Sequence, residues 1–295
     1  MKTLYKGAAY LSLAASIWGG TYVASKFAME SIPPFTLMLM RYLLAGITLI
    51  WLCRRQNIPV VPTENKGLLW MIGFAGYFLS IAAQFIGTKL SSAHMGAVIT
   101  TLAPVFQSIF AILILKEAMS FRQVIAAVIS LSGVFIIVGI PGDTDSQVSL
   151  GGILSLLLAG ILWGYYSVLS RKASRSHTPL QITTWGILVA ILPTALAAYF
   201  EWDQWVFVSL FHPPVLFSVV YISIIATAVA FLYWNKGLAL VPSHNAGLFF
   251  FFQPLVGTLL GWLLLNEALT LGFFAGSSLV LAGVYYTMSN SQAES

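Results

Sequence analysis

The acidic side chains that could do chemistry in this chain are few, and two of them occur in the same unusual context. Glu117 and Glu267 each follow a proline by thirteen residues inside an otherwise apolar run. A carboxylate in such surroundings could carry a proton or cap the first amides of the next helix. We favour the structural role, because acids at helix ends are routine and no acid lies in the middle of a run. The prolines, Pro104 and Pro254, are expected to free carbonyl groups in mid-helix.

Patterns typical of an enzyme are absent from the sequence. The single cysteine, Cys53, excludes an intrachain disulfide, and neither H-E-x-x-H nor G-x-S-x-G occurs. No pair of aspartates lies within an apolar run, so an aspartyl site in the membrane is not indicated either. We therefore predict no enzyme, no metal and no cofactor. A membrane-embedded enzyme is the alternative from another class, and product analysis would reveal it.

Long apolar helices are the elements that must position the remaining polar groups. Hydrophobic residues make up 59% of the chain and charged residues only 8%, against about 25% charged residues in a soluble domain. Uncharged runs that reach the roughly 17–25 residues of a membrane-crossing helix occupy 7–25, 67–88, 90–115, 123–142, 146–170, 176–200, 204–235, 237–266 and 268–293, and a tenth run, 32–53, is interrupted only by Arg41. Runs of this length are typical of helices, whereas barrel strands would alternate over about ten residues.

A repeat relates the two halves of the chain. Shifts of 145 or 150 residues align Trp18-Gly19 with Trp163-Gly164, Pro104 with Pro254, Glu117 with Glu267, and Gly133 with Gly283. We assign 1–140 and 147–290 as two halves of five helices each. Because five is odd, the second half must enter the membrane from the opposite side. The predicted fold class is therefore an all-α polytopic membrane protein, with ten transmembrane helices as two inverted five-helix repeats.

The basic residues predict how these helices are oriented. With the N-terminus in the cytoplasm, the outer connections receive only Lys26 and Lys89. The inner segments receive eleven basic residues: Lys2, Lys6, Arg54, Arg55, Lys66, Lys116, Arg122, Arg171, Lys172, Arg175 and Lys236. This asymmetry follows the positive-inside rule, so we expect a multi-pass protein of the cell (inner) membrane with both termini cytoplasmic. The basic residues then orient the chain in the lipid bilayer, and no nucleic-acid partner is predicted.

Several short motifs, duplicated and in a fixed order, resemble those of a known family. They are the Trp-Gly pair followed by Lys26, the proline thirteen residues before a Glu-Ala dipeptide, and Ala282-Gly283-Val284 near the end. Over essentially its whole length the chain resembles the drug/metabolite transporter (DMT) superfamily, in its ten-helix EamA-type branch. The resemblance implies a carrier that works by alternating access, with a cavity lined mainly by helices 1, 3, 4, 6, 8 and 9. It also implies small organic substrates, such as amino acids, related metabolites or drugs, more often exported than imported.

Polar and aromatic side chains within the helices are the candidate substrate-binding residues, because such groups are costly in a bilayer. They are Trp18, Tyr22, Arg41, Tyr77, Gln84, Trp163, Tyr166, Asn235 and Gln253. Tyr77 and Gln84 fall on one helical stripe. Arg41 matches an arginine frequent in the second helix of the family, and it could pair with a substrate carboxylate or snorkel to the headgroups. The alternative is that these groups only join helices, at about 1–2 kcal/mol per hydrogen bond.

These observations favour a secondary transporter of a small-molecule substrate, most simply an exporter of amino acids or related metabolites. Aromatic and neutral polar groups suit a solute with an apolar body and a few hydrogen-bonding groups, whereas a phosphate would require clustered Arg or Lys. A multidrug exporter, a metabolite importer of the same fold and a channel are the alternatives. The motifs Gly257-x-x-x-Gly261 and Gly272-x-x-x-Gly276 permit close helix packing and leave a homodimer open.

Overall fold

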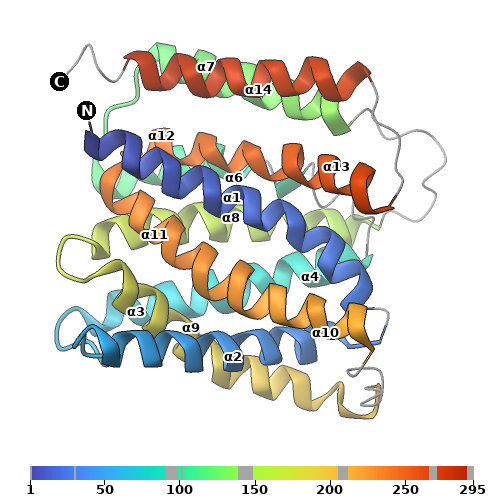
Figure 1. Cartoon of the computed structure of the whole chain (residues 1–295). Helices are drawn as coiled ribbons and strands as arrows, with labels where there is room; N and C mark the ends of the chain where they lie inside the picture. The colour runs from blue at the N-terminus through green and yellow to red at the C-terminus, as the bar shows by residue number, and fades with distance from the viewer. Residues whose placement is uncertain are drawn as a thin grey trace.

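Helices make up the regular elements in the part of the chain that the structure describes. The structure is a computed structural model, and it describes residues 2–29, 31–90, 99–100, 102–138, 149–204, 212–265 and 271–290. Within these ranges most helices run back and forth along one common direction (Figure 1). The all-helical fold expected from the long apolar runs is confirmed for these ranges.

Within the described residues, the first half forms five helical rods, two of which are built from several segments. Three are single helices: α1 (Lys2–Met29), α2 (Pro34–Arg55) and α7 (Phe121–Val138). The third rod joins α3 (Lys66–Met71), the π-helix η1 (Ile72–Ser80) and α4 (Ile81–Leu90). The fourth rod joins α6 (Ala103–Phe110) to the π-helix η2 (Ala111–Leu115).

The second half repeats this arrangement. Its single helices are α8 (Leu150–Ala173), α9 (Pro179–Tyr199) and α14 (Leu271–Asn290), and a 3-10 turn, η3 (Trp202–Gln204), follows α9. Another rod joins α10 (Pro213–Val220), the π-helix η5 (Tyr221–Val229) and α11 (Ala230–Leu240). The rod before α14 joins α12 (Ser243–Leu248), the 3-10 segment η6 (Phe249–Phe251) and α13 (Phe252–Leu265).

Several of these rods have the length and composition of membrane-spanning helices. Five of them qualify within the described residues: Pro34–Arg55, Lys66–Gly87, Leu150–Ala173, Pro179–Tyr199 and Pro213–Leu240. Shorter apolar helices occupy Ala103–Leu115, Phe121–Gly133 and Phe274–Gly283. The chain therefore has the architecture of a multi-pass membrane protein.

Prolines and hydroxyl residues begin several helices, at positions where a backbone N–H has no partner inside the helix. Pro34, Pro179 and Pro213 occupy the first turn of α2, α9 and α10. Before α9, the Thr178 hydroxyl accepts a hydrogen bond from the Gln181 N–H at 3.2 Å. These starts follow directly from the local sequence.

The two halves interlock with each other. α1 packs on α11 and α13 of the second half, whereas α8 packs on α4 and α6 of the first. α2 packs on α9, and α7 packs on α14. Figure 1 shows α7 with α14 along one side of the bundle and α2 with α9 along the opposite side. The pairs α2–α9 and α7–α14 each join two helices that the repeat relates. Because the repeat also relates α1 to α8, the contacts of α1 with the second half match those of α8 with the first, as in other transporters built from inverted repeats.

Glycines of the Trp-Gly motifs set two of the closest helix contacts. A Cβ at Gly19 would lie 2.9 Å from the Gly257 nitrogen, and a Cβ at Gly164 would lie 2.6 Å from the Gln107 nitrogen. Because Gly257 and Gln107 are related by the 150-residue shift, the motif makes the same contact in both halves. The absence of a side chain lets α1 approach α13, and α8 approach α6, at backbone distance.

The pairing of α7 with α14 follows the same symmetry. A Cβ at Gly133 would lie 2.5 Å from the Gly276 carbonyl oxygen, and one at Gly283 would lie 2.8 Å from the Ala126 carbonyl oxygen. Gly257 and Gly276, which belong to the two Gly-x-x-x-Gly motifs, thus pack within the chain. The homodimer stays a prediction that these contacts do not test.

One end of the bundle carries the beginning of α1 and the end of α14 (Figure 1). The connections from α2 to α3, from α8 to α9 and from α11 to α12 lie at the same end. Basic residues end two of these helices, Arg54 and Arg55 on α2 and Arg171 and Lys172 on α8. We call this the termini end.

Candidate functional site

The two tryptophans that the repeat relates meet in the core of the bundle. The ring centroids of Trp18 on α1 and Trp163 on α8 lie 5.0 Å apart, edge to face at 86°. Around Trp18 pack Phe231 at 5.2 Å, Trp234 at 5.4 Å and Phe250 at 6.2 Å. Such ring pairs contribute about 0.5–1.5 kcal/mol each beyond the area they bury. We call these five residues the aromatic cluster.

The two indole N–H groups of the central pair differ in their partners. Trp18 Nε1 donates to the Ala226 carbonyl oxygen at 2.8 Å. Trp163 Nε1 is buried, and it has no hydrogen-bond partner among the described residues. A buried donor without a partner costs about 1–3 kcal/mol of stability. Such a donor within a transmembrane bundle is a candidate ligand contact.

A network of neutral polar groups adjoins the aromatic cluster. Its hub is Asn235 on α11, which accepts from Tyr166 OH at 3.1 Å and donates to Tyr77 OH at 3.1 Å and to Thr183 Oγ1 at 2.8 Å. Tyr42 OH donates to the Tyr77 carbonyl oxygen. We call these five residues the polar network. It joins α2, η1, α8, α9 and α11, and so it connects both halves of the chain.

Two π-helices position part of this site. η1 begins at Ile72 and η5 begins at Tyr221, which are nearly equivalent positions in the two halves. In a π-helix the N–H of each residue bonds five residues back, and such wide turns are frequent at functional sites. η1 carries Tyr77. η5 carries Thr227, the residue that the 150-residue shift aligns with Tyr77, and its hydroxyl donates to the Ile222 carbonyl oxygen at 2.6 Å.

Arg41 on α2 brings a positive charge into the same region. The residue is 4% exposed, and its Nε donates to Thr227 Oγ1 at 2.8 Å. Its guanidinium carbon lies 5.5 Å from the centroid of the Tyr42 ring. None of the described carboxylates forms an ion pair with it. The guanidinium is thus enclosed by protein, which differs from the exposed end of a snorkelling side chain.

The remaining substrate-binding candidates lie outside these groups. Gln84 on α4 is half-buried, and within the described residues its side chain makes no hydrogen bond. Gln253 on α13 is buried. The side chain of Tyr22 and the whole of Glu267 lie outside the described residues. The described residues include no group of three or more His, Cys, Asp or Glu side chains that could hold a metal.

The two prolines predicted in mid-helix instead begin α-helical segments. Pro104 lies in the first turn of α6, and Pro254 is the third residue of α13, directly after η6. In a first turn the missing proline N–H would have had no partner within the helix. Pro254 nevertheless lies within the rod of α12, η6 and α13, so the freed carbonyl groups expected at the two prolines stay a prediction. Pro104 packs against α12, since a Cβ at Gly247 would lie 3.2 Å from the Pro104 Cα.

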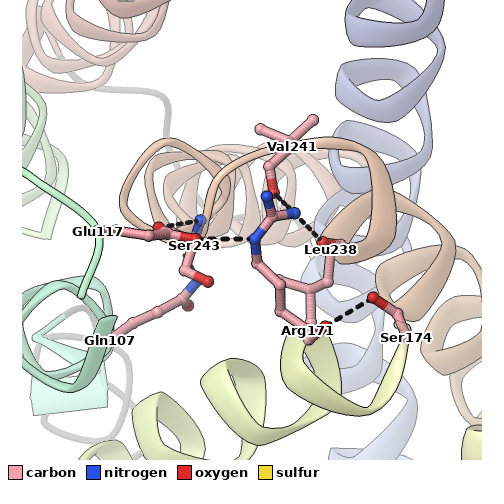
Figure 2. A network of polar contacts seen from close by, with 7 residues as sticks. All are labelled: Gln107, Glu117, Arg171, Ser174, Leu238, Val241 and Ser243. Carbon is pink, nitrogen blue, oxygen red and sulfur yellow. Dashed lines mark hydrogen bonds and ion pairs between the residues drawn. The ribbon is translucent and has the colours of Figure 1, made fainter. Parts of the chain in front are cut away.

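An ion pair at the termini end joins three helix ends (Figure 2). Arg171 Nε, in the last turn of α8, lies 2.9 Å from Glu117 Oε1. Arg171 Nη1 also donates to the carbonyl oxygens of Leu238 and Val241, at 2.6 Å each, where α11 ends. Glu117 Oε2 accepts from the N–H of Ser243, the first residue of α12, at 2.9 Å. We call these five residues the latch.

The charges of the latch match the ends of the helices that they contact. The carbonyl end of α11 is partly negative and faces the guanidinium, and the amide end of α12 is partly positive and faces the carboxylate. Glu117 thus caps a helix of the other half, while the N–H of Ser120, before α7, donates to Gln123 Oε1 at 2.7 Å. Gln107 Nε2 supports the latch by donating to the Ser243 carbonyl oxygen at 2.6 Å.

Several residues of the site were not among the candidates taken from the sequence. They are Tyr42, Thr183, Thr227 and Arg171. A threonine in an apolar run commonly bonds a carbonyl of its own helix, as Thr184 and Thr194 do, so its sequence context carries little signal. The sequence context of Tyr42 carries a stronger signal, because Tyr42 follows Arg41, the only charged residue in the apolar run 32–53. Arg171 was considered only as one of the basic residues that orient the chain in the membrane.

Known proteins resemble this chain over most of its length. The protein "Uncharacterized transporter YetK" of Bacillus subtilis (strain 168) is 26% identical over 291 residues, covering 95% of this chain and 86% of that protein. The "Probable amino-acid metabolite efflux pump" of Salmonella typhimurium is 24% identical over 282 residues, covering 92% of this chain and 91% of that protein. One solved structure, described as "Crystal structure of protein", has a TM-score of 0.83 at 20% identity and covers 98% of this chain and 99% of its own, which shows the shared fold.

A family model matches the chain twice, once in each half. The model is that of the "EamA-like transporter family", and it matches residues 5–139 and 150–289. Together the two matches leave only the chain ends and a short central segment uncovered. The helices, the apolar composition and the interlocked halves described above agree with a transporter. The chain therefore belongs to the EamA-like transporter family.

Proposed function

We propose that this membrane transporter exports amino acids or closely related metabolites by alternating access. The Salmonella relative is named an amino-acid metabolite efflux pump, and its 24% identity gives modest support for that substrate class. The chemistry of the core agrees with it. The aromatic cluster supplies flat apolar surfaces, and the polar network supplies neutral donors and acceptors. Pockets for small organic molecules usually combine these two kinds of surface.

The unpaired indole N–H of Trp163 is the observation that carries this proposal. It lies in a cluster to which both halves contribute rings, and Trp18 and Trp163 hold equivalent places in the repeat. A carrier with inverted repeats binds its solute between the halves, where either face can reach it. The free donor lowers stability in the absence of an acceptor, and a carbonyl or carboxylate oxygen of the solute would offset that loss.

Besides a binding site between the halves, alternating access requires a contact that closes one face of the carrier. We assign this role to the latch. It ties Glu117 of the first half to the ends of α8, α11 and α12 of the second half. We assign the termini end to the cytoplasm from the basic-residue asymmetry. In this assignment the latched conformation is closed on the cytoplasmic side, and separation of the ion pair admits the solute from the cell interior.

Counterflow in proteoliposomes tests the proposal. Vesicles loaded with unlabelled L-phenylalanine should accumulate external labelled phenylalanine transiently, and the initial rate should saturate. Other apolar amino acids should compete, whereas glucose 6-phosphate should not. Liposomes without protein supply the baseline. A channel would equilibrate the label without overshoot, and chemical analysis of the recovered solute would reveal an enzyme.

The two parts of the proposal fail separately. Overshoot with a sugar phosphate and with no amino acid would reject the substrate class and leave a carrier. Overshoot with cationic dyes, and with no amino acid, would indicate a multidrug exporter of the same fold. Leakage without overshoot for every solute would reject alternating access itself.

A further inference from the structure

We propose that Arg41, with Ser223, forms the site that recognises a carboxylate group of the transported solute. This inference deepens the proposed function, because it names the chemical group by which substrates are selected. It rests on a buried cation, on an unpaired hydroxyl about one helical turn from the threonine that this cation contacts, and on the connection of that segment to the aromatic cluster.

The burial of Arg41 sets a requirement for an anion. At 4% exposure the guanidinium is enclosed by protein, and a buried charge is costly unless an opposite charge or several hydrogen bonds compensate it. Intramembrane charges of this kind mark sites for substrates or ions.

The described residues supply only part of that compensation. A guanidinium has five N–H donors, and here one of them, on Nε, donates to Thr227 Oγ1. An acid does lie close to α2, but Glu201 is engaged by the N–H of Thr36 at 2.9 Å and by its hydroxyl at 3.3 Å, five residues before Arg41. No described carboxylate forms an ion pair with Arg41.

The η5 helix presents a second group suited to an anion. The hydroxyl of Ser223 is fully buried and has no hydrogen-bond partner among the described residues. Ser223 precedes Thr227 by four residues, about one turn of this helix, and η5 packs on α2, which carries Arg41. Thr227 accepts from Arg41 and donates to Ile222, so it positions the guanidinium, and the free hydroxyl of Ser223 can donate to an incoming oxygen.

The same segment of η5 connects Arg41 to the aromatic cluster. Ala226, which precedes Thr227, accepts from Trp18 Nε1, and the Trp18 ring packs on Trp163, the residue with the free indole N–H. A solute could therefore place a carboxylate near Arg41 and its apolar body against the rings. One guanidinium among neutral groups matches a singly charged carboxylate, whereas a phosphate dianion would require further cations.

The experiment compares probes that share a phenyl body and differ in the carboxylate. The probes are L-phenylalanine, 3-phenylpropanoate, L-phenylalaninamide and 2-phenylethylamine, and thermal stabilisation of the purified full-length protein reports their dissociation constants. The two carboxylates should bind about 10–100-fold more tightly than the amide and the amine, as expected for a hydrogen-bonded ion pair. In Arg41→Gln this ratio should fall to about twofold, and Arg41→Lys should retain part of it, because lysine keeps the charge without the planar fork.

Two further variants make the test specific. Arg55→Gln is the matched control, since Arg55 ends the same helix with its guanidinium over the Trp51 ring, and it should leave the ratio unchanged. Ser223→Ala should weaken the carboxylates about threefold and leave the amide unaffected, as the loss of one hydrogen bond predicts. This variant decides the matter if Arg41→Gln does not fold, because it removes only a hydroxyl.

Several outcomes would overturn the assignment. Equal binding of phenylalanine and its amide by the unmodified protein would do so, as would a carboxylate preference that survives both Arg41→Gln and Ser223→Ala. Stabilisation by chloride or sulfate equal to that by the carboxylates would mean a general anion site. Arg41-dependent binding of 3-phenylpropanoate without transport of any amino acid would uphold the carboxylate site and reject amino-acid export.

Discussion

The polar network and the latch both join the two halves through polar groups, and they do so with opposite chemistry. The network is neutral and enclosed, with Tyr77, Tyr166 and Asn235 almost without exposure. The latch uses full charges at the edge of the bundle, where the side chains of Arg171 and Glu117 are 24% and 17% exposed. The network shares each group among several neighbours, whereas the latch depends on one ion pair and its backbone contacts.

Because of this difference, separating the contacts of the polar network and of the latch costs different amounts of free energy. A buried neutral group that loses its partner costs about 1–3 kcal/mol, because no water replaces the bond. The ions of the latch can be hydrated again, and exposed ion pairs contribute only about 0–1 kcal/mol. The latch is therefore suited to repeated opening. The network is suited to persist, or to exchange a protein partner for a group on the solute.

The largest effect is expected in the core, at Trp163. Trp163→Ala should reduce counterflow to the baseline and lower the melting temperature, since loss of a buried aromatic ring costs about 3–5 kcal/mol. Trp163→Phe keeps a ring and removes the free N–H. It should lower kcat/KM about fivefold while the melting temperature changes little, because the lost donor has no partner in the protein.

Trp18, which the repeat relates to Trp163, supplies the control for the Trp163→Phe variant. Trp18→Phe breaks the bond to the Ala226 carbonyl oxygen and should lower the melting temperature more than Trp163→Phe does. Full activity in Trp163→Phe would show that the free N–H does not contact the solute, and the assignment of the central site would then lose its main support.

An intermediate effect is expected at the latch. Arg171→Gln should favour opening at the termini end, by about fivefold if the ion pair contributes about 1 kcal/mol. A cysteine in place of Ala246, buried in α12, reports opening through its rate of maleimide labelling in a Cys53→Ser background. That rate should rise about fivefold in Arg171→Gln.

Exchange of the two charges sharpens this result. The double variant Arg171→Glu with Glu117→Arg should restore part of the slow labelling. Glu117→Gln should lower stability or yield and leave the pH dependence of transport unchanged, because the carboxylate caps α12. A well-expressed Glu117→Gln protein that has lost proton-linked transport would assign proton coupling to this residue instead.

The smallest effect is expected at Gln84, which belongs to neither region. Its side chain makes no hydrogen bond within the described residues, so Gln84→Ala should change stability by less than about 0.5 kcal/mol. If the amide contacts the solute, as we predict, the KM should rise about threefold. An unchanged KM would remove Gln84 from the site, whereas a large loss of stability would place it among the structural groups.

Much of the architecture could be predicted from the sequence, because only helices and closed barrels can cross a bilayer. Long uncharged runs that cross a bilayer must be helices. The shift of 150 residues aligns Gly133 with Gly283, and these two glycines occupy equivalent places where α7 packs on α14. The prolines in the first turns of α2, α9 and α10 are a further local signal of helix starts, although none of the predictions above used it. These features depend on local sequence or on a repeat visible in the sequence.

The interlocking of the halves could not be predicted in the same way. Spacing along a helix shows which residues share a face, but it does not show which helix that face meets. Glu117 was therefore expected at a helix junction without its partner Arg171, 54 residues away. For the same reason the repeat paired Trp18 with Trp163 in alignment without indicating that their rings touch. Pro104 was placed in mid-helix because nothing in the apolar run around it marks where α6 begins.

The matched π-helices carry information about ancestry. A wide turn accommodates an extra residue in an α-helix, and one residue rotates everything that follows by about 100° around the helix axis. η1 and η5 carry this rotation at nearly the same place in both halves. A wide turn already present in one five-helix unit would account for both by a single insertion, whereas separate origins would require two insertions at corresponding places. Tyr77 and Thr227 hold corresponding positions in these turns and differ in chemistry.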